Sequence, residues 1–451
     1  MQKLLGKIGL EIHVYPITKE KLFCRCKASR EKGLRANTLI CPICTGQAGA
    51  KPMLPNEEAV KKAVKIGLML GCKINSKLGW KRKHYDWPDL PKGYQNTISG
   101  AKATPIGVKG NFLGKEIWSM HLEEDPASWE PETGRVDYNR SGLPLIEIIT
   151  APEFESAEEV VAWLGKLIHN LAYLKDVDSN AGIKVDVNVS VKGTERVEIK
   201  NINSLESIGK AIEYEIERQK SEGSIRETRR FDFASGKTIS MRGKEEADDY
   251  RFINDPDLQD IVIDEKFVSN LKGSLPEKPE KKIEKFIKKH KIDKKNAEVL
   301  AKHLDIAEFF EKVAEQIDAL FALPWVTIEL LRHLNYHSKT LEQLDIGVDD
   351  FVKLIKLVKE GKITELQGKQ ILNKFYPKSF DPTKDFLGKI SDAGKLEKIA
   401  KKVIAENKKS VEDYLAGEEK ALNYLMGKIM EKTNRRADFS AAKKVLIKLL
   451  K

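Results

Sequence analysis

The sequence predicts an α+β protein with three parts: a mainly antiparallel sheet domain with flanking helices, residues 1–274, a helical domain, residues 275–380, and a small helical tail domain, residues 381–451. Three observations lead to this prediction. Short segments of alternating apolar and polar residues dominate the first part, and apolar residues at helical spacing dominate the rest. Proline-rich breaks at residues 275–282 and 377–383 separate the parts. A chain of 451 residues is long enough for several domains, each with its own core.

The clearest strand signal is a predicted hairpin over Ile183–Asn201. Its valines alternate strictly with polar residues, and Lys192–Thr194 supplies the turn. Asp186, Ser190 and Glu198 therefore belong to its polar surface. For an isolated hairpin, a solvated outer face is the simpler interpretation.

Two other short strands carry acids in the same manner. In Ile8–Val14 the apolar residues face one way, and Glu11 and His13 face the other. In Leu145–Ile149, Glu147 interrupts an apolar run. Charged residues are seldom buried unless they are paired or bind a metal. Several strands with acids in apolar surroundings therefore favour a shared cation site, and oxygen ligands with one imidazole suit Mg²⁺ or Mn²⁺, with phosphate completing the shell.

Three consecutive acids, Glu123, Glu124 and Asp125, follow His121 at the end of another predicted strand. Like charges this close repel one another, and a cation or solvent relieves the repulsion. The segment Trp118–Glu124 fits either phase of strand alternation, so the sequence does not decide which acid joins the cation site.

Four of the five cysteines form two close pairs, Cys24 with Cys26 and Cys41 with Cys44, and Cys72 stands apart. Two thiolate pairs on either side of a short loop are typical of a tetrahedral Zn²⁺ knuckle in a reducing compartment. Four thiolates close the coordination shell, so the role would be structural. Disulfides are the weaker alternative.

The segment Lys81–Gln95 mixes aromatic, proline and basic residues without a period, and we expect an ordered loop. Lys92 and the backbone N–H groups beside it could reach a phosphate, although a plain surface loop is the alternative. Further along, the apolar spacing predicts helices at 157–174 and, after the linker, at Ile306–Ala322 among others.

Composition narrows the function classes. The net charge is +11, and residues 273–451 hold 37 Lys and Arg against 28 Asp and Glu, which predicts a polyanion bound by the C-terminal part. A lysine-rich, thermophile-like surface is the alternative. No apolar run of membrane-spanning length and no secretory leader is present, so we expect a cytoplasmic protein. The glycine patterns of P-loop and dinucleotide-binding sites are absent, and so is the nucleophile elbow of hydrolases.

The motifs together resemble those of the GatB/GatE family, in which GatB is one component of the tRNA-dependent amidotransferases. The matching stretches are GLEIHV, LFCRC with CPIC, PDLPKGYQ, HLEED, VDYNRSGLPLIEI, VDVNVSV and EIKNINS. The last part, from NKKSVEDYLAGEEK onward, is similar to the C-terminal tail domain of that family. The resemblance covers nearly the whole chain, in order.

This resemblance implies a catalytic cradle domain that uses ATP to phosphorylate the side-chain carboxylate of Glu-tRNA(Gln) and, in many members of the family, of Asp-tRNA(Asn). Ammonia channelled from a partner amidase, GatA, would then displace the phosphate, and a small GatC subunit would join the complex. It also implies a misacylated tRNA held by the helical region and tail.

The resemblance implies roles for thirteen residues. The Mg²⁺ ligands would be Glu11, His13, Glu124 and Glu147, and further acidic ligands or ammonia-guiding groups would be Asp186 and Glu198. The phosphate contacts would be Lys92, Ser190 and Arg140, and the structural Zn²⁺ ligands would be Cys24, Cys26, Cys41 and Cys44. Two other functions compete with this interpretation. One is a non-catalytic tRNA- or rRNA-binding scaffold, and the other is a stand-alone ATP-dependent ligase that needs no partner subunits.

Overall fold

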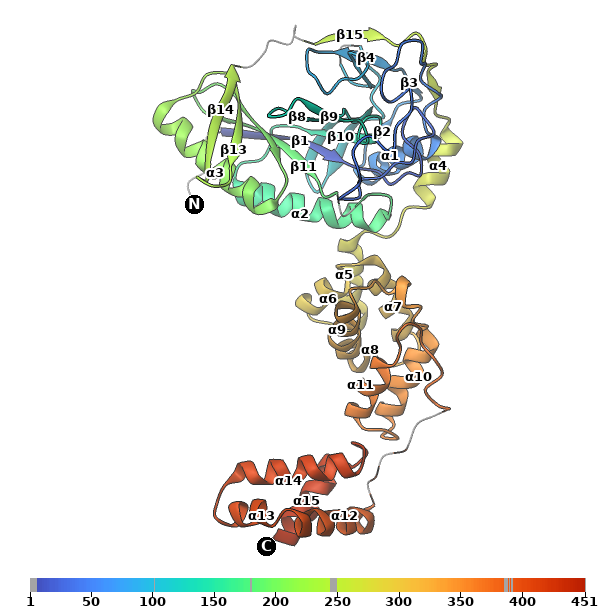
Figure 1. Ribbon diagram of the computed structural model, residues 1–451, viewed down its shortest axis with the longest axis vertical. Coiled ribbons are helices and arrows are strands. Elements are labelled where there is room, and N and C mark those ends of the chain that lie inside the picture. The colour runs from blue at the N-terminus through green and yellow to red at the C-terminus, as the bar shows by residue number, and fades with distance from the viewer. Residues whose placement is uncertain are drawn as a thin grey trace. The chain divides into compact units, whose positions relative to one another are not determined.

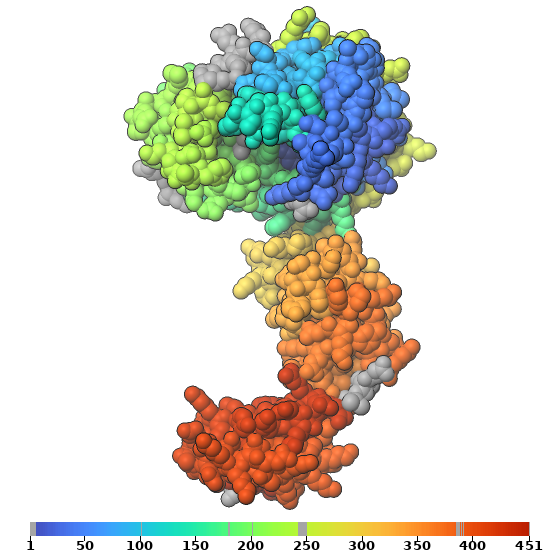
Figure 2. All heavy atoms as spheres, in the orientation of Figure 1, coloured from blue at the N-terminus to red at the C-terminus, as the bar shows by residue number. Residues whose placement is uncertain are grey.

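A computed structural model describes residues 6–100, 102–178, 181–243, 250–384, 388, 390 and 392–450. The chain divides into two compact units, residues 1–277 and 278–451. Figure 1 traces them from blue to yellow and from yellow to red, and Figure 2 shows the same view with all heavy atoms. The predicted class is confirmed, because a large, mainly antiparallel sheet with helices is followed by a helical region.

The first unit is built on a twelve-stranded sheet with the order β14-β13-β12-β11-β1-β10-β7-β5-β4-β15, in which β6 also pairs with β7 and β2 with β6. Among the described strands, only β12 and β13 pair in parallel. The strands of this sheet are β1 Gly6–Val14, β2 Lys73–Ile74, β4 Lys81–His84, β5 Gln95–Thr97, β6 Gly107–Phe112, β7 Lys115–Glu124, β10 Pro144–Thr150, β11 Lys184–Val191, β12 Val197–Ile202, β13 Glu227–Asp232, β14 Lys237–Gly243 and β15 Arg251–Asn254. Two small ribbons complete the set: β3 Lys77–Leu78 with β16 Ile261–Val262, and β8 Ser128–Glu130 with β9 Arg135–Asp137.

Helices cover one face of the central strands. They are α1 Glu57–Met69, α2 Ala157–Leu174, α3 Leu205–Glu222 and α4 Glu265–Gly273. The predicted helix 157–174 is confirmed, and the Oγ atom of Ser156 caps it by accepting from the Glu159 N–H at 3.2 Å. Its apolar side shares one core with the alternate apolar residues of β1, such as Leu10 and Ile12. The opposite face of those strands is left to the polar residues.

One local expectation was wrong. Lys81–His84 is not part of a loop but a strand, β4, which pairs with β5 and with β15. All four of its residues are half-buried, so no alternation marks the strand. Its partner β15 lies about 170 residues further along the chain, so no local turn signals the pairing.

The second unit is helical, in agreement with the prediction. It contains α5 Pro279–His290, α6 Lys294–Leu300, α7 Leu304–Ala314, α8 Ala319–Pro324, the π-helix η2 Trp325–Leu330, α9 Leu331–His337, the 3₁₀ turn η3 Glu342–Leu344, α10 Val348–Lys359, α11 Glu365–Asn373, α12 Ala393–Glu406, α13 Lys408–Leu415, α14 Glu419–Lys432 and α15 Phe439–Leu450.

The single helix expected at Ile306–Ala322 is instead two helices, α7 and α8, because Asp318 ends the run by capping α8 through the Phe321 N–H at 2.8 Å. The helices have two separate cores, one around Phe286, Phe310 and Phe351 and one around Leu425 and Leu446. None of the helices that the structure describes is long and apolar enough to cross a membrane.

Candidate active site and metal centre

The polar face of the central sheet carries acids from five neighbouring strands, β7, β10, β1, β11 and β12. In the antiparallel register, His13 of β1 lies opposite Glu147 of β10, and Glu147 lies opposite His121 of β7. Glu11 lies opposite Asp186 of β11. Residues that pair in this way project from the same face of the sheet. The structure therefore places Glu11, His13 and Glu147 on one face of the sheet.

The His13 and Glu147 side chains form the centre of this face. The Nε2 atom of His13 is 3.7 Å from Oε1 of Glu147. Burial would lower the pKa of His13, but the hydrogen bond and charge of Glu147 raise it to about 9. Burial would raise the pKa of Glu147, and His13 outweighs that effect and lowers it to about 2. Glu147 is therefore held as a carboxylate.

Glu123 is the acid of the HLEED motif that faces this site. It lies opposite Leu145 of β10 and Thr97 of β5, on the face that carries Glu147. The side chain is buried, and its Oε2 atom has no hydrogen-bond partner among the described residues. Burial and the nearby charge of Glu147 raise the pKa of Glu123 to about 7. A buried carboxylate oxygen without a partner is costly unless a cation binds it, so this oxygen fits a metal ligand.

Glu124 is not on that face, contrary to the sequence prediction, because consecutive strand residues point to opposite sides of a sheet. Its carboxylate accepts hydrogen bonds from the Lys92 Nζ group and, at 2.8 Å, from the Asn96 N–H. The Lys92 Nζ group also donates to the Asn96 Oδ1 atom at 2.6 Å. The predicted phosphate contact Lys92 is thus paired with a predicted metal ligand.

A second group of acids lies beside the first. One carboxylate oxygen from each of Glu11, Asp186 and Glu198 lies within 4.8 Å of the others. The Lys200 Nζ group is 2.7 Å from both Asp186 and Glu198. Burial would lower the pKa of Lys200, but these two charges raise it above its usual range. Asn188 donates to the Glu11 Oε1 atom at 3.0 Å. This group therefore places three acids around Lys200.

Of the other two predicted phosphate contacts, Ser190 and Arg140, only Ser190 lies at the site. Ser190 lines a cavity of about 170 Å³ that also exposes Glu11, Lys7 and Arg196. Arg140 does not line this cavity. Its guanidinium donates to the backbone carbonyls of Pro126 at 2.8 Å and Ala127 at 2.5 Å, and so fixes the turn after the HLEED motif.

Sequence reasoning missed one cation of this face. Lys83 lies on β4, and its charge lowers the pKa of both Glu123 and Glu147. Its Nζ atom also lies 4.9 Å from the ring centroid of Tyr250. Recognising it required the β4 strand, which has no sequence signal of its own.

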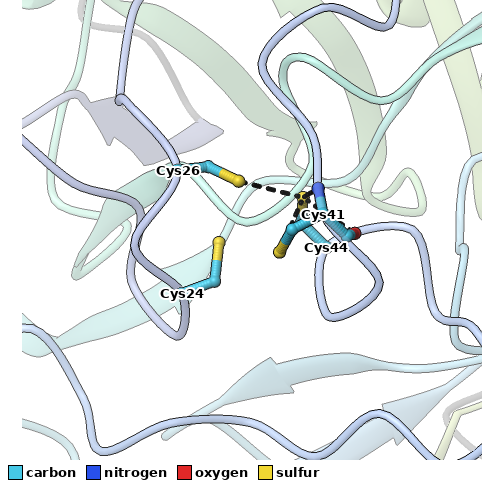
Figure 3. Close-up of side chains that lie close together, drawn as sticks. All are labelled: Cys24, Cys26, Cys41 and Cys44. Carbon is cyan, nitrogen blue, oxygen red and sulfur yellow. Dashed lines mark hydrogen bonds between the residues drawn. The ribbon is translucent and has the colours of Figure 1, made fainter.

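The four paired cysteines come together as predicted (Figure 3). Their Sγ atoms all lie within 4.8 Å of one another, with Cys26–Cys44 at 4.0 Å and Cys41–Cys44 at 3.9 Å. Tetrahedral zinc with Zn–S bonds of about 2.3 Å separates its sulfurs by about 3.8 Å. These distances exceed a disulfide bond of about 2.05 Å, and all five cysteines are free thiols. The hydrogen bond from Cys24, aided by the charge of Lys21, lowers the pKa of Cys44 to about 4. The cluster fits a metal such as zinc.

Comparison with known proteins covers both units. Residues 6–269 match the family model described as the GatB/GatE catalytic domain, and residues 308–450 match the model described as the GatB domain. Similar relatives are the B subunits of aspartyl/glutamyl-tRNA(Asn/Gln) amidotransferases. That of Methanocaldococcus jannaschii is 42% identical over 100% of this chain and 98% of its own. Those of Methanopyrus kandleri and Methanobrevibacter smithii are 42% and 41% identical, over 96% and 97% of this chain and 96% and 98% of their own.

Proposed function

This chain belongs to the GatB/GatE family, and from that membership we propose that it is the catalytic subunit of a tRNA-dependent amidotransferase. It converts the side-chain carboxylate of Glu-tRNA(Gln), or of Asp-tRNA(Asn), into the amide. In the first step a carboxylate oxygen attacks the γ-phosphorus of ATP, which forms an acyl phosphate and releases ADP. In the second step ammonia attacks the acyl carbon and phosphate leaves.

The observation that carries this proposal is the buried Glu123 oxygen without a partner among the described residues, beside Glu147 and His13. We infer that these three side chains, with Glu11, hold Mg²⁺, and that His13 gives up its proton when the ion binds. Glu123 takes the place that the sequence prediction gave to Glu124. When bound, Mg²⁺ neutralises the phosphate oxygens and aligns them for transfer. Glu147 contributes a carboxylate that stays ionised at neutral pH, and His13 fixes its orientation.

Around that centre, we assign the cavity lined by Ser190, Lys7 and Arg196 to the phosphates of ATP. Two cations and a hydroxyl are suited to a polyphosphate. Glu11 lines this cavity and also belongs to the group that it forms with Asp186 and Glu198. Lys200 contacts both of those acids. We propose that they bind a second cation or guide ammonia toward the acyl phosphate.

The partners are those that membership of this family implies. Ammonia comes from an amidase subunit, GatA, and a small GatC subunit completes the complex. The tRNA is held by the basic second unit, where Lys and Arg outnumber Asp and Glu by nine over residues 273–451. Arg140 and the Lys92–Glu124 pair shape the loops beside the site.

The test of the reaction is ATP hydrolysis by the reconstituted complex with Glu-tRNA(Gln). We expect Glu147→Gln and His13→Ala to reduce turnover by more than about 100-fold, because even an indirect contact to a metal ligand is worth 10- to 100-fold. Glu116→Gln, on the same strand as Glu123 but exposed, is the matched control. Unchanged turnover in the first two variants would refute the metal-site assignment.

The same assay separates the competing functions. A non-catalytic scaffold predicts no ATP hydrolysis under any condition. A stand-alone ligase predicts amide formation from free ammonium without any partner subunit. The amidotransferase predicts that glutamine supports the reaction only when the amidase subunit is present.

We also propose that Cys24, Cys26, Cys41 and Cys44 hold a structural Zn²⁺. Metal analysis of the purified chain should give one equivalent of zinc. Cys24→Ser should lose the metal and unfold at a lower temperature, whereas Cys72→Ser should keep the zinc. Zinc well below one equivalent in the wild-type chain would refute the assignment.

A further inference from the structure

Three aromatic side chains of the second unit form a connected cluster on its surface. Tyr336 and His337 end helix α9, and Tyr376 follows helix α11. We name these three residues the aromatic platform. Tyr336 is 81% exposed and Tyr376 is 49% exposed, although tyrosines normally place most of their ring against a core. So much aromatic surface in water is typical of an interaction site.

The rings of the platform are fixed in place. The His337 ring stacks on the Tyr376 ring with 4.0 Å between centroids and 11° between planes. The Tyr336 ring meets the His337 ring edge-on at 5.0 Å. His337 also packs edge-on against the buried His333 at 4.8 Å, and the buried Phe375 precedes Tyr376. The platform is therefore anchored to the core of this unit.

The stack leaves part of Tyr376 uncovered. His337 covers one face of the Tyr376 ring, yet about half of the surface of the Tyr376 residue remains exposed. A further flat ring could continue the stack there, in the order His337, Tyr376, ligand.

Cations flank the platform. Arg332 lies one turn before Tyr336 on α9 and donates to the Asn373 Oδ1 atom at 2.9 Å, which joins the two halves of the platform. Lys339, Lys374 and Lys378 are exposed and lie two or three residues from Tyr336 or Tyr376. Lys378 pairs with Asp345 at 2.9 Å, whereas the described part of the chain shows no ion pair for Lys339 or Lys374.

We propose that the aromatic platform stacks against unpaired bases of the bound tRNA, while the flanking lysines contact the adjoining phosphates. This inference rests on the proposed function, which supplies the tRNA. Aromatic rings beside basic residues are the usual means by which proteins bind unstacked RNA bases. The exposed neighbours Asn335, Ser338 and Asn373 are polar, so the rings do not belong to an apolar groove of the kind that a protein partner fills.

The experiment measures tRNA(Gln) affinity of the full-length chain, assembled with its partner subunits, over a range of salt concentrations. We expect Tyr336→Leu and Tyr376→Leu each to weaken binding by about 5- to 100-fold, as the loss of one stacked base does, with an unchanged salt slope. Tyr336→Phe and Tyr376→Phe keep the ring and should stay within about twofold of the wild type. Replacing both Lys339 and Lys374 by Gln should instead reduce the salt slope by about two.

Two further measurements make the result specific. A continuous RNA duplex offers no unstacked base, so its affinity should not change in the leucine variants. ATP turnover at saturating tRNA should also be unchanged, because the platform lies outside the catalytic unit, while the KM for tRNA rises.

Wild-type affinity in both leucine variants would overturn this inference alone. Loss of a partner subunit from the purified complex in those variants would overturn it as well, in favour of a protein contact. If the wild-type complex neither binds tRNA nor hydrolyses ATP in its presence, the proposed function fails, and this inference fails with it.

Discussion

Two buried groups of charges in the first unit differ in a way that separates structure from chemistry. The first, around Glu215 of α3, includes Arg218, Glu227 and Arg229. Glu215 is fully buried and accepts from Arg218 at 2.6 Å, from Gln219 at 2.9 Å and from Thr238 at 2.7 Å. Both of its oxygens have partners, and two arginines balance two glutamates.

The second group is the polar face around Glu147. Here Glu123 is also buried, but one of its oxygens has no partner among the described residues. The nearby Glu11, Asp186 and Glu198 surround one lysine, Lys200. Burial of charge is therefore common to both groups, and among the described residues only the second of them has a buried carboxylate oxygen without a partner. We take that oxygen as the sign of a site that completes its interactions with a ligand.

The largest effect should come from breaking the satisfied group. Glu215→Ala leaves Arg218 without its main partner and takes a second carboxylate away from Arg229, whose nearer partner is Glu227, and we expect it to lower the free energy of unfolding by about 3–5 kcal/mol. Urea denaturation monitored by circular dichroism measures this change. Glu206→Ala, on the exposed side of the same helix, should leave the free energy of unfolding nearly unchanged. Similar stabilities for the two variants would contradict the structural role of the Glu215 group.

In the unsatisfied group, replacing the buried acid should raise the free energy of unfolding instead of lowering it. The pKa of Glu123 is raised to about 7 from an ordinary value of 4.5, so the folded chain binds an extra proton between these values. Glu123 therefore makes its full contribution to the free energy of unfolding below pH 4.5, and this contribution is lost as the pH rises through 7. Without added metal, Glu123→Gln should be more stable than the wild type at pH 8 by on the order of 2 kcal/mol. An advantage that does not shrink from pH 8 to pH 5 would contradict this assignment.

The smallest expected effect is the stabilisation of the folded chain by Mg²⁺. It tests the difference between the two groups of charges without any assay of activity. At ten times its dissociation constant, a ligand that binds only the folded state stabilises it by about 1.4 kcal/mol. We expect added Mg²⁺ to raise the melting temperature of the wild type by a few degrees, and to have no effect on Glu147→Gln. Glu215→Gln should still respond to Mg²⁺, at its own lower melting temperature. An equal response of wild type and Glu147→Gln would place the cation elsewhere.

Much of the site follows from the sequence because it depends on alternation. The strict period of two in β1, β11 and β12 placed Glu11, His13, Asp186 and Glu198 on polar faces, and the antiparallel register then brought them together. The spacing of the four cysteines likewise predicted their cluster.

Other parts depended on contacts that no local pattern records. Glu123 and Glu124 were indistinguishable because the residues before them fit both phases, and only the pairing of β7 with β10 decides between them. Lys83 was hidden because β4 has no alternation and finds its partner β15 far along the chain. Nothing in the sequence around Glu215 marks it as buried, because its partners Arg229 and Thr238 come from β13 and β14.

The central place of β1 has a consequence for how the protein is made. This strand lies between β10 and β11, and its partner residues are Ile146–Ile149 on one side and Lys184–Val191 on the other. On the ribosome, neither ladder of β1 can form until β10, which ends at Thr150, has been translated, and the second must wait until β11 ends at Val191. At 5–20 residues per second, that delay lasts on the order of ten seconds or more. The strand that carries Glu11 and His13 is thus among the first to be synthesised and must wait for its neighbours, which makes nascent chains of this protein natural clients for chaperones.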